Sequence, residues 1–124
     1  MAAPNIAALT TMTGKTDAVS LTTTSLTPVL SNAASSGLVL RVTSLRVSNV
    51  DGSASSSITV SYNNQAAGAG TEFELVQLKS VAQNEYAEIV TKDSPIYLEE
   101  DTSLTATASG ANDFKVVVTY EEIS

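Results

Sequence analysis

The chain has 124 residues, 13 of them acidic and 6 basic, and it contains no His, Cys or Trp. This length is typical of one domain with one hydrophobic core, and the composition excludes disulfides, thiolate nucleophiles, imidazole bases and metal sites built on Cys or His. The formal net charge of −7, with no cluster of Lys or Arg, argues against nucleic-acid binding, because phosphate backbones are themselves anionic.

The first third of the chain shows short strand patterns separated by polar turns. Residues 1–13 are weakly patterned, and we expect them to form an N-terminal arm or an edge strand. Gly14-Lys15 is a candidate turn, followed by a strand over residues 18–24. Pro28 confines the next strand to a sheet edge or to a strand start, because proline has no amide hydrogen to donate to a ladder.

The middle third contains the clearest strand, over residues 38–50. Its apolar positions change parity at Thr43-Ser44, which predicts a β-bulge or bend there. A strand follows over residues 57–62. Residues 63–70, rich in Ala and Gly, predict a mobile loop tip. The strand over residues 73–81 again mixes two parities.

The last third continues with strands over residues 86–90, 96–98 and 104–108, in the same alternating style. Residues 110–113 (Gly-Ala-Asn-Asp) predict a hairpin turn into the final strand, residues 114–123. In that strand, alternate residues form one mostly apolar face, which is typical of an antiparallel sheet packed on one side. The apolar face consists of Phe114, Val116, Val118 and Tyr120.

These patterns predict an all-β chain. Charged residues make up only 15% of it, whereas 17 Ser and 16 Thr are present; Thr favours strands and Ser favours turns. The apolar fraction of 43% argues against disorder. We expect residues 14–124 to form a single antiparallel β-sandwich of about eight or nine strands, with a jelly-roll or an immunoglobulin-like topology.

The densest set of oxygen ligands is Glu99, Glu100 and Asp101, with Asp113 one predicted hairpin away. Hard cations such as Ca²⁺ prefer several carboxylates around one point. The spacing matches no known calcium loop, however, and acidic residues before a strand usually form a solvated turn. The sequence therefore favours a turn over a metal site and predicts no cofactor.

The other candidate groups also have structural explanations. Glu121-Glu122 suggests a charged edge that discourages strand addition. Glu85 and Glu88 would point to opposite faces of a strand, which is unsuitable for paired catalytic carboxylates. Serine has no histidine to activate it. Most of the six aromatic residues are expected in the core, with Tyr97 the one expected at the surface.

The absence of reacting groups predicts a structural or interaction module rather than an enzyme. Small Ser, Thr and Ala side chains on strand faces favour close packing in a homo-oligomer. Residues 1–13 could reach a neighbour by strand addition. No run approaches 18 apolar residues, and residues 1–5 lack the features of a signal peptide. We therefore expect synthesis in the cytoplasm and no membrane partner.

Several segments resemble small virion structural proteins of tailed bacteriophages, above all those of contractile-tailed phages that infect marine cyanobacteria. The segments are SPIYLEEDTSL at residues 94–104, ATASGAND at 106–113, VVVTYEEI at 116–123, VLSNAASSG at 29–37 and VSNVDG at 47–52. They are strand-and-turn patterns and carry no catalytic or ligand residues of the family.

This resemblance implies a β-sandwich located in the virion, in contact with other virion proteins. Head decoration (cement) or a neck or capsid accessory role fits the acidic, neutral-polar exterior, and the major capsid protein is then a candidate partner. A tail or fibre accessory protein is the alternative within the same class. A carbohydrate-binding module that contacts the host surface is the alternative from another class, and an enzyme is the third.

Overall fold

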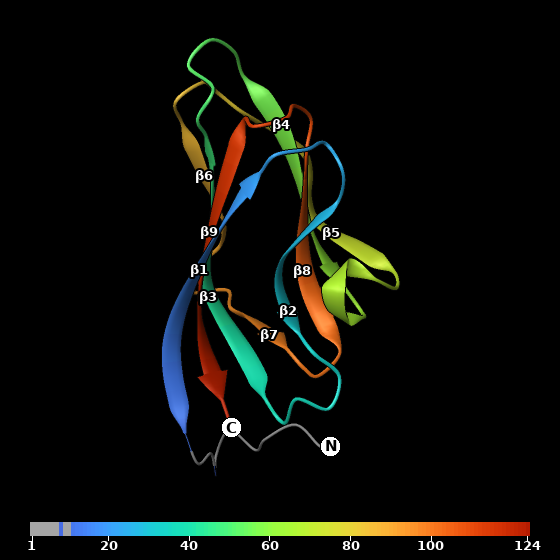
Figure 1. Ribbon diagram of the computed structural model, residues 1–124. Coiled ribbons are helices and arrows are strands. Elements are labelled where there is room, and N and C mark those ends of the chain that lie inside the picture. The colour runs from blue at the N-terminus through green and yellow to red at the C-terminus, as the bar shows by residue number, and fades with distance from the viewer. Residues whose placement is uncertain (1–7, 9–10) are drawn as a thin grey trace.

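The computed structural model describes residue 8 and residues 11–124 and shows two facing antiparallel sheets (Figure 1). Sheet A has the strand order β1-β9-β3-β6, with β7 also paired to β3, and sheet B has the order β2-β8-β4-β5. In this part of the chain the elements are β1 (Met12–Leu21), β2 (Thr27–Asn32), β3 (Val39–Asn49), β4 (Ser56–Asn63), the 3-10 helix η2 (Ala66–Gly68), β5 (Glu72–Val81), β6 (Tyr86–Val90), β7 (Ile96–Leu98), β8 (Thr102–Ala108) and β9 (Phe114–Ile123).

The chain alternates between the two sheets, and this identifies the topology. Strands β1, β3, β6, β7 and β9 lie in sheet A, whereas β2, β4, β5 and β8 lie in sheet B. Among the described strands, β4 and β5 are the one pair of sequence neighbours that are also hydrogen-bonded neighbours. This order is the double Greek key of a jelly roll and not the immunoglobulin arrangement. The predicted all-β sandwich is therefore confirmed, and of the two topologies the structure has the jelly roll.

The core lies between the sheets and follows the predicted alternation. In β9, Phe114, Val116, Val118 and Tyr120 are buried, as their shared face predicts. They lie beside the buried residues of β3 on the inner face of sheet A and pack against sheet B. The buried side chains of β3 include Val42, Leu45 and Val47, and those of sheet B include Ile58, Val60 and Leu104. The predicted bulge in β3 is confirmed, because its pairing with β9 shifts between Val42 and Ser44. The extra residue lets apolar positions on both sides of the bulge face the same core.

Pro28 lies in β2, at the edge of sheet B, as predicted. The predicted turn at Gly14-Lys15 is wrong. Strand β1 continues through both residues, with Gly14 opposite Glu121 and Lys15 opposite Tyr120. A complete ladder with β9 outweighs the local turn preference of one glycine. Of the predicted arm or edge strand, Met12 and Thr13 begin β1, and residues 1–7, 9 and 10 lie outside the described residues.

The predicted hairpin at residues 110–113 is also wrong. Strands β8 and β9 belong to different sheets, so this segment crosses from one sheet to the other. Asn112 adopts a left-handed conformation (φ 64°), and its amide donates to the Leu21 carbonyl at 2.9 Å. The Gly and Asn residues do mark a turn, but the turn joins two layers and not two paired strands.

Residues 63–70, for which the sequence predicts a mobile tip, form a hydrogen-bonded turn on the outer face of sheet B (Figure 1). The amide of Ala67 donates to Ser31 Oγ at 2.9 Å, and that of Gly68 donates to Ser103 Oγ at 3.0 Å. A Cβ on Gly68 would lie 3.0 Å from Leu26 and 3.2 Å from Thr105. Glycine is needed here because the backbone approaches the sheet closely.

Three buried asparagines tie loops to the ends of strands. Asn32, Asn49 and Asn63 are the last residues of β2, β3 and β4, and each is at most 2% exposed. Each carboxamide nitrogen donates to two backbone carbonyls: Asn32 to Leu38 and Leu98, Asn49 to Ala54 and Val81, and Asn63 to Gly68 and Ala69. These side chains satisfy loop carbonyls that the sheets leave without partners.

Candidate functional site

A cleft with a mostly apolar lining and several polar side chains opens between the sheets on the side formed by β1 and β2. The cleft has a volume of about 400 Å³ and is lined by residues that include Asp17, Leu30, Asn32, Leu40, Tyr120 and Glu122. Alternation along β1 places Lys15 and Asp17 on the inner face of sheet A, because they pair with Tyr120 and Val118 of β9. Edge strands commonly turn charged residues inward at such positions, where the sandwich is open.

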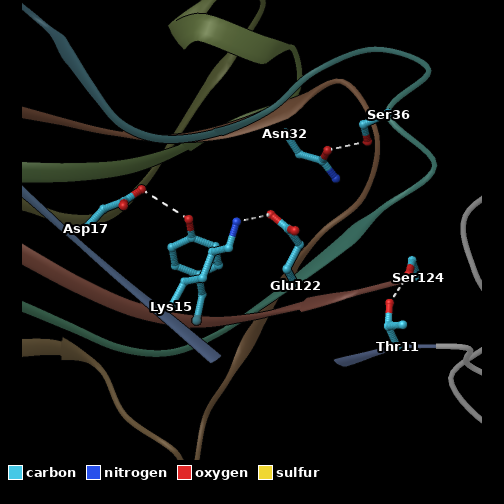
Figure 2. A network of polar contacts seen from close by, with 8 residues as sticks. Thr11, Lys15, Asp17, Asn32, Ser36, Glu122 and Ser124 are labelled. Carbon is cyan, nitrogen blue, oxygen red and sulfur yellow. Dashed lines mark hydrogen bonds and ion pairs between the residues drawn. The ribbon is translucent and has the colours of Figure 1, made fainter. Parts of the chain in front are cut away.

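The cleft residues are linked in two pairs (Figure 2). Lys15 Nζ donates to Glu122 Oε2 at 3.1 Å. Tyr120 Oη donates to Asp17 Oδ2 at 3.2 Å. Burial, and then the nearby Asp17 carboxylate, raises the pKa of Tyr120 to about 12, because both disfavour the phenolate. Tyr120 is therefore a neutral hydrogen-bond donor at physiological pH.

Asn32 closes the far end of the cleft. It accepts a hydrogen bond from Ser36 Oγ at 2.6 Å through its side-chain oxygen (Figure 2). Near the start of β1, the Thr11 and Ser124 hydroxyls are also hydrogen-bonded, and the two residues exchange both backbone hydrogen bonds. These neutral and paired groups join β1 to β9, and Asn32 joins β2 to the loop that follows it. It offers binding contacts and has no nucleophile placed beside a base.

The four carboxylates considered as candidate metal ligands, Glu99, Glu100, Asp101 and Asp113, are not brought together. Asp101 Oδ1 accepts the Ala66 amide at the start of β8, whereas Asp113 Oδ2 accepts Ser56 Oγ beyond the other end of β8. The seven residues of β8 separate them by about 20 Å. Glu99 is exposed and Glu100 half-buried in the turn before β8. Among the described residues, no three acidic side chains are grouped closely enough to hold a metal ion.

The carboxylates at the end of the chain do not form a charged edge, and that prediction is wrong. Strand β9 lies between β1 and β3, in the interior of sheet A. Glu121 pairs with Arg41 of β3 at 2.8 Å, and Glu122 pairs with Lys15 of β1. Glu88 forms an ion pair with Arg46 at 3.1 Å. These carboxylates link neighbouring strands.

The aromatic residues divide evenly between the interior and the surface. Phe114 and Tyr120 are buried, and Tyr62 is half-buried. Tyr97, predicted to be exposed, is 42% exposed, but Phe73 and Tyr86 are also exposed, by 53% and 56%. The prediction that most aromatics are in the core is therefore wrong for two of them. Tyr86 lies on β6 and contacts the guanidinium of Arg46, whose carbon is 4.6 Å from the ring centre.

Among the described strands, β5 has the most large apolar side chains that are exposed to solvent. We call Phe73, Leu75 and Leu78 of this strand the β5 edge; Leu78 is 67% exposed. Strand β5 ends sheet B, and its pairing with β4 shifts on both sides of Val60. The mixed parity of the apolar residues along this strand marks the same irregularity in the sequence, because each extra residue exchanges the two faces of a strand. That signal could have identified the β5 edge.

Within the described residues no helix has the length and apolar character needed to cross a membrane. No protein-family model matches the chain, and no curated protein matches its sequence. The fold is similar to that of a chain in the acidic stable capsid structure of Helicobacter pylori bacteriophage KHP30, with a TM-score of 0.53 and 8% sequence identity over 94% of this chain and 90% of that chain. At this identity the likeness establishes a shared fold.

Proposed function

We propose that the chain is a non-enzymatic structural protein of a bacteriophage virion, with head decoration (cement) or a neck or capsid accessory role as its specific task. The observation that carries this proposal is the likeness to a chain of a phage capsid structure, which extends over nearly the whole of both chains. The sequence resemblance to virion proteins points to the same class. Because one fold hosts many functions, the role is argued further from the surface.

The surface supports a role that acts through contact. The cleft between β1 and β2 holds paired, unreactive groups, whereas the β5 edge presents apolar side chains to solvent. Exposed apolar groups of this kind are typical of protein–protein contacts. The partners in this proposal are other virion proteins, with the major capsid protein first, and further copies of the chain.

Residues 1–13 are proposed as the capsid anchor. No charged side chain precedes Lys15, and the segment includes Ile6 and Leu9. Its last two residues, Met12 and Thr13, begin β1, which ends sheet A. An uncharged segment attached to an edge strand is suited to strand addition on a neighbouring subunit.

Two finer points rest on the sequence alone. A contractile-tailed cyanophage as the source stays a prediction from the resemblance. A tail or fibre accessory role differs from head decoration only in position within the particle.

For a carbohydrate-binding module, Tyr86 and Tyr97 would have to form one stacking platform. They pair with Ser48 and Arg41, seven positions apart on β3, or about 23 Å. The distance makes a shared platform unfavourable.

Electron cryomicroscopy of particles with and without the protein tests the proposal. Under the proposal, the particles that contain it show additional sandwich-shaped density on the head or neck, and deletion of residues 1–13 removes that density. Density at the tail would favour the tail accessory. Absence from purified particles would contradict the virion proposal, and binding on a glycan array would contradict the decoration role.

A further inference from the structure

The loop between β3 and β4 contains an aspartate followed directly by a glycine, Asp51-Gly52. An aspartyl side chain can react with the amide nitrogen of the next residue to close a five-membered succinimide ring, and glycine hinders this attack least because it has no side chain. Gly52 is exposed, and among the hydrogen bonds of the described residues its amide has no acceptor. The attacking nitrogen is therefore free.

The Asp51 carboxylate, by contrast, is held by the residue that follows the glycine. Its Oδ1 accepts the Ser53 hydroxyl at 2.7 Å and the Ser53 amide at 2.9 Å. Aspartates in turns commonly accept the amide two residues further along the chain. The two hydrogen bonds restrain rotation of the carboxyl group and favour its ionised form. The pKa of Asp51 lies below its ordinary value for this reason, with the Ser53 hydroxyl as the main cause.

We propose that Asp51-Gly52 is a site of slow, spontaneous isomerisation to isoaspartate, and that Ser53 sets its rate. In the first step the Gly52 nitrogen attacks Asp51 Cγ; a C–N bond forms, a C–O bond breaks, and the hydroxyl leaves as water with the proton of the nitrogen. A second water then opens either carbonyl of the ring, which regenerates aspartate or gives isoaspartate.

Ser53 acts on the first of these steps. The ring closes from the protonated acid, because the ionised group would have to expel oxide in place of water. The hydrogen bonds from Ser53 reduce the protonated fraction, and they also oppose the rotation that brings Cγ to the nitrogen of Gly52. This inference concerns the chemistry of the loop and is independent of the proposed virion role.

Isoaspartate at this position would alter the connection between β3 and β4. The side-chain oxygen of Asn49 accepts the Asp51 amide at 2.9 Å, and its nitrogen donates to the Ala54 carbonyl at 3.2 Å and the Val81 carbonyl at 2.9 Å. Isoaspartate adds one methylene to the main chain between the Asp51 amide and the Ala54 carbonyl. The spacing that lets Asn49 contact both groups is then lost, so an aged chain loosens at this end of the sandwich.

Accelerated ageing of the full chain tests the site. The original chain and Ser53→Ala are incubated in warm, mildly acidic buffer, and isoaspartate at position 51 is measured by chromatography and fragmentation mass spectrometry of the isomeric peptides. We expect Ser53→Ala to form isoaspartate about fivefold faster, because the carboxylate loses one of its two donors. Ser53 is exposed, so this variant should fold, and circular dichroism before incubation checks that it does.

The matched control is Gly52→Ala, which keeps Ser53 and hinders the attacking nitrogen. A Cβ on Gly52 would lie 3.9 Å from the side-chain oxygen of Asn84, its nearest contact outside the adjoining residues, so this variant should also fold. It should form isoaspartate at position 51 more slowly than the original chain. Equal rates in the original chain and Ser53→Ala would overturn the role of Ser53, and no isoaspartate at position 51 in Ser53→Ala would overturn the site. Neither result depends on whether the protein is found in virions.

Discussion

The two lateral sides of the sandwich differ in the side chains that their edge strands present to solvent. On the β1/β2 side, the open edge contains Pro28 and two inward polar pairs, Lys15–Glu122 and Asp17–Tyr120. On the β5/β6 side, the long edge strand has bulges and exposed apolar side chains. The first arrangement satisfies its polar groups within one chain, whereas the second leaves apolar area to be covered. The difference shows that the two sides of one sandwich can treat their edge strands in different ways, one with paired polar groups and one with exposed apolar groups.

The largest expected effect comes from Asn32, which anchors the β1/β2 side. In Asn32→Ala, the half-buried carbonyl of Leu38 and the buried carbonyl of Leu98 lose their donor. We expect the free energy of unfolding to fall by about 2–4 kcal/mol, measured by urea denaturation. Gln83→Ala, at an exposed amide, is the control and should change stability little. An equal effect of both variants would contradict the anchoring role.

The next effect should have the opposite sign and concerns the other side. In Leu78→Gly, the left-handed backbone is no longer strained, so the free energy of unfolding should rise by about 1 kcal/mol. The neighbouring variant Gln77→Gly should instead lower the free energy of unfolding, because glycine loses more backbone freedom on folding than glutamine does. Thermal unfolding of both variants checks the prediction. It is wrong if Leu78→Gly destabilises the chain as much as Gln77→Gly does.

Tyr120→Phe tests the polar pair in the cleft through its dependence on pH. The folded pKa of Tyr120 is raised to about 12, above the ordinary value near 10, so the unfolded chain releases its proton first. The original chain should be more stable than the variant by about 1 kcal/mol at neutral pH, and this advantage should decline as the pH rises from about 10 to 12. Ultraviolet titration should show one ionisation near pH 12 that the variant lacks.

The smallest effect is expected for the ion pair at the rim of the cleft. Lys15 and Glu122 are both partly exposed, and exposed pairs contribute little because water and salt screen them. A double-mutant cycle with Lys15→Ala and Glu122→Ala should give a coupling energy below about 1 kcal/mol that decreases with added salt. A larger, salt-independent coupling would mean that this side is more deeply closed than its exposure indicates.

The sequence predicted those features that depend on one strand and one core. Alternation identified the buried face of β9, and a change of parity located the bulge near Thr43-Ser44 in β3. Pro28 correctly marked an edge strand. These predictions succeed because a side chain's face follows directly from its position along a pleated strand.

The predictions failed where long-range pairing decides the outcome. Residues 110–113 were taken for a hairpin because turn residues specify a change of direction but not the sheet that the next strand joins. Glu121-Glu122 suggests an edge because charged residues often block strand addition, but β9 is central, and no local pattern reveals which strands will flank it. The three buried asparagines were also missed, since Asn in a sequence indicates a turn, and only the tertiary structure shows that its side chain crosses to another loop.

The central position of β9 has a consequence for biosynthesis. The last strand of the jelly roll lies between the first and the third, and it places Thr16 beside Thr119, 103 positions further along the chain. Sheet A therefore cannot form completely while β9 is still inside the ribosome, because β1 and β3 are each paired with β9 and not with each other. Folding dominated by such distant contacts is slow, and the waiting chain exposes apolar strands. We expect newly made chains to depend on chaperones until translation has released the final strand.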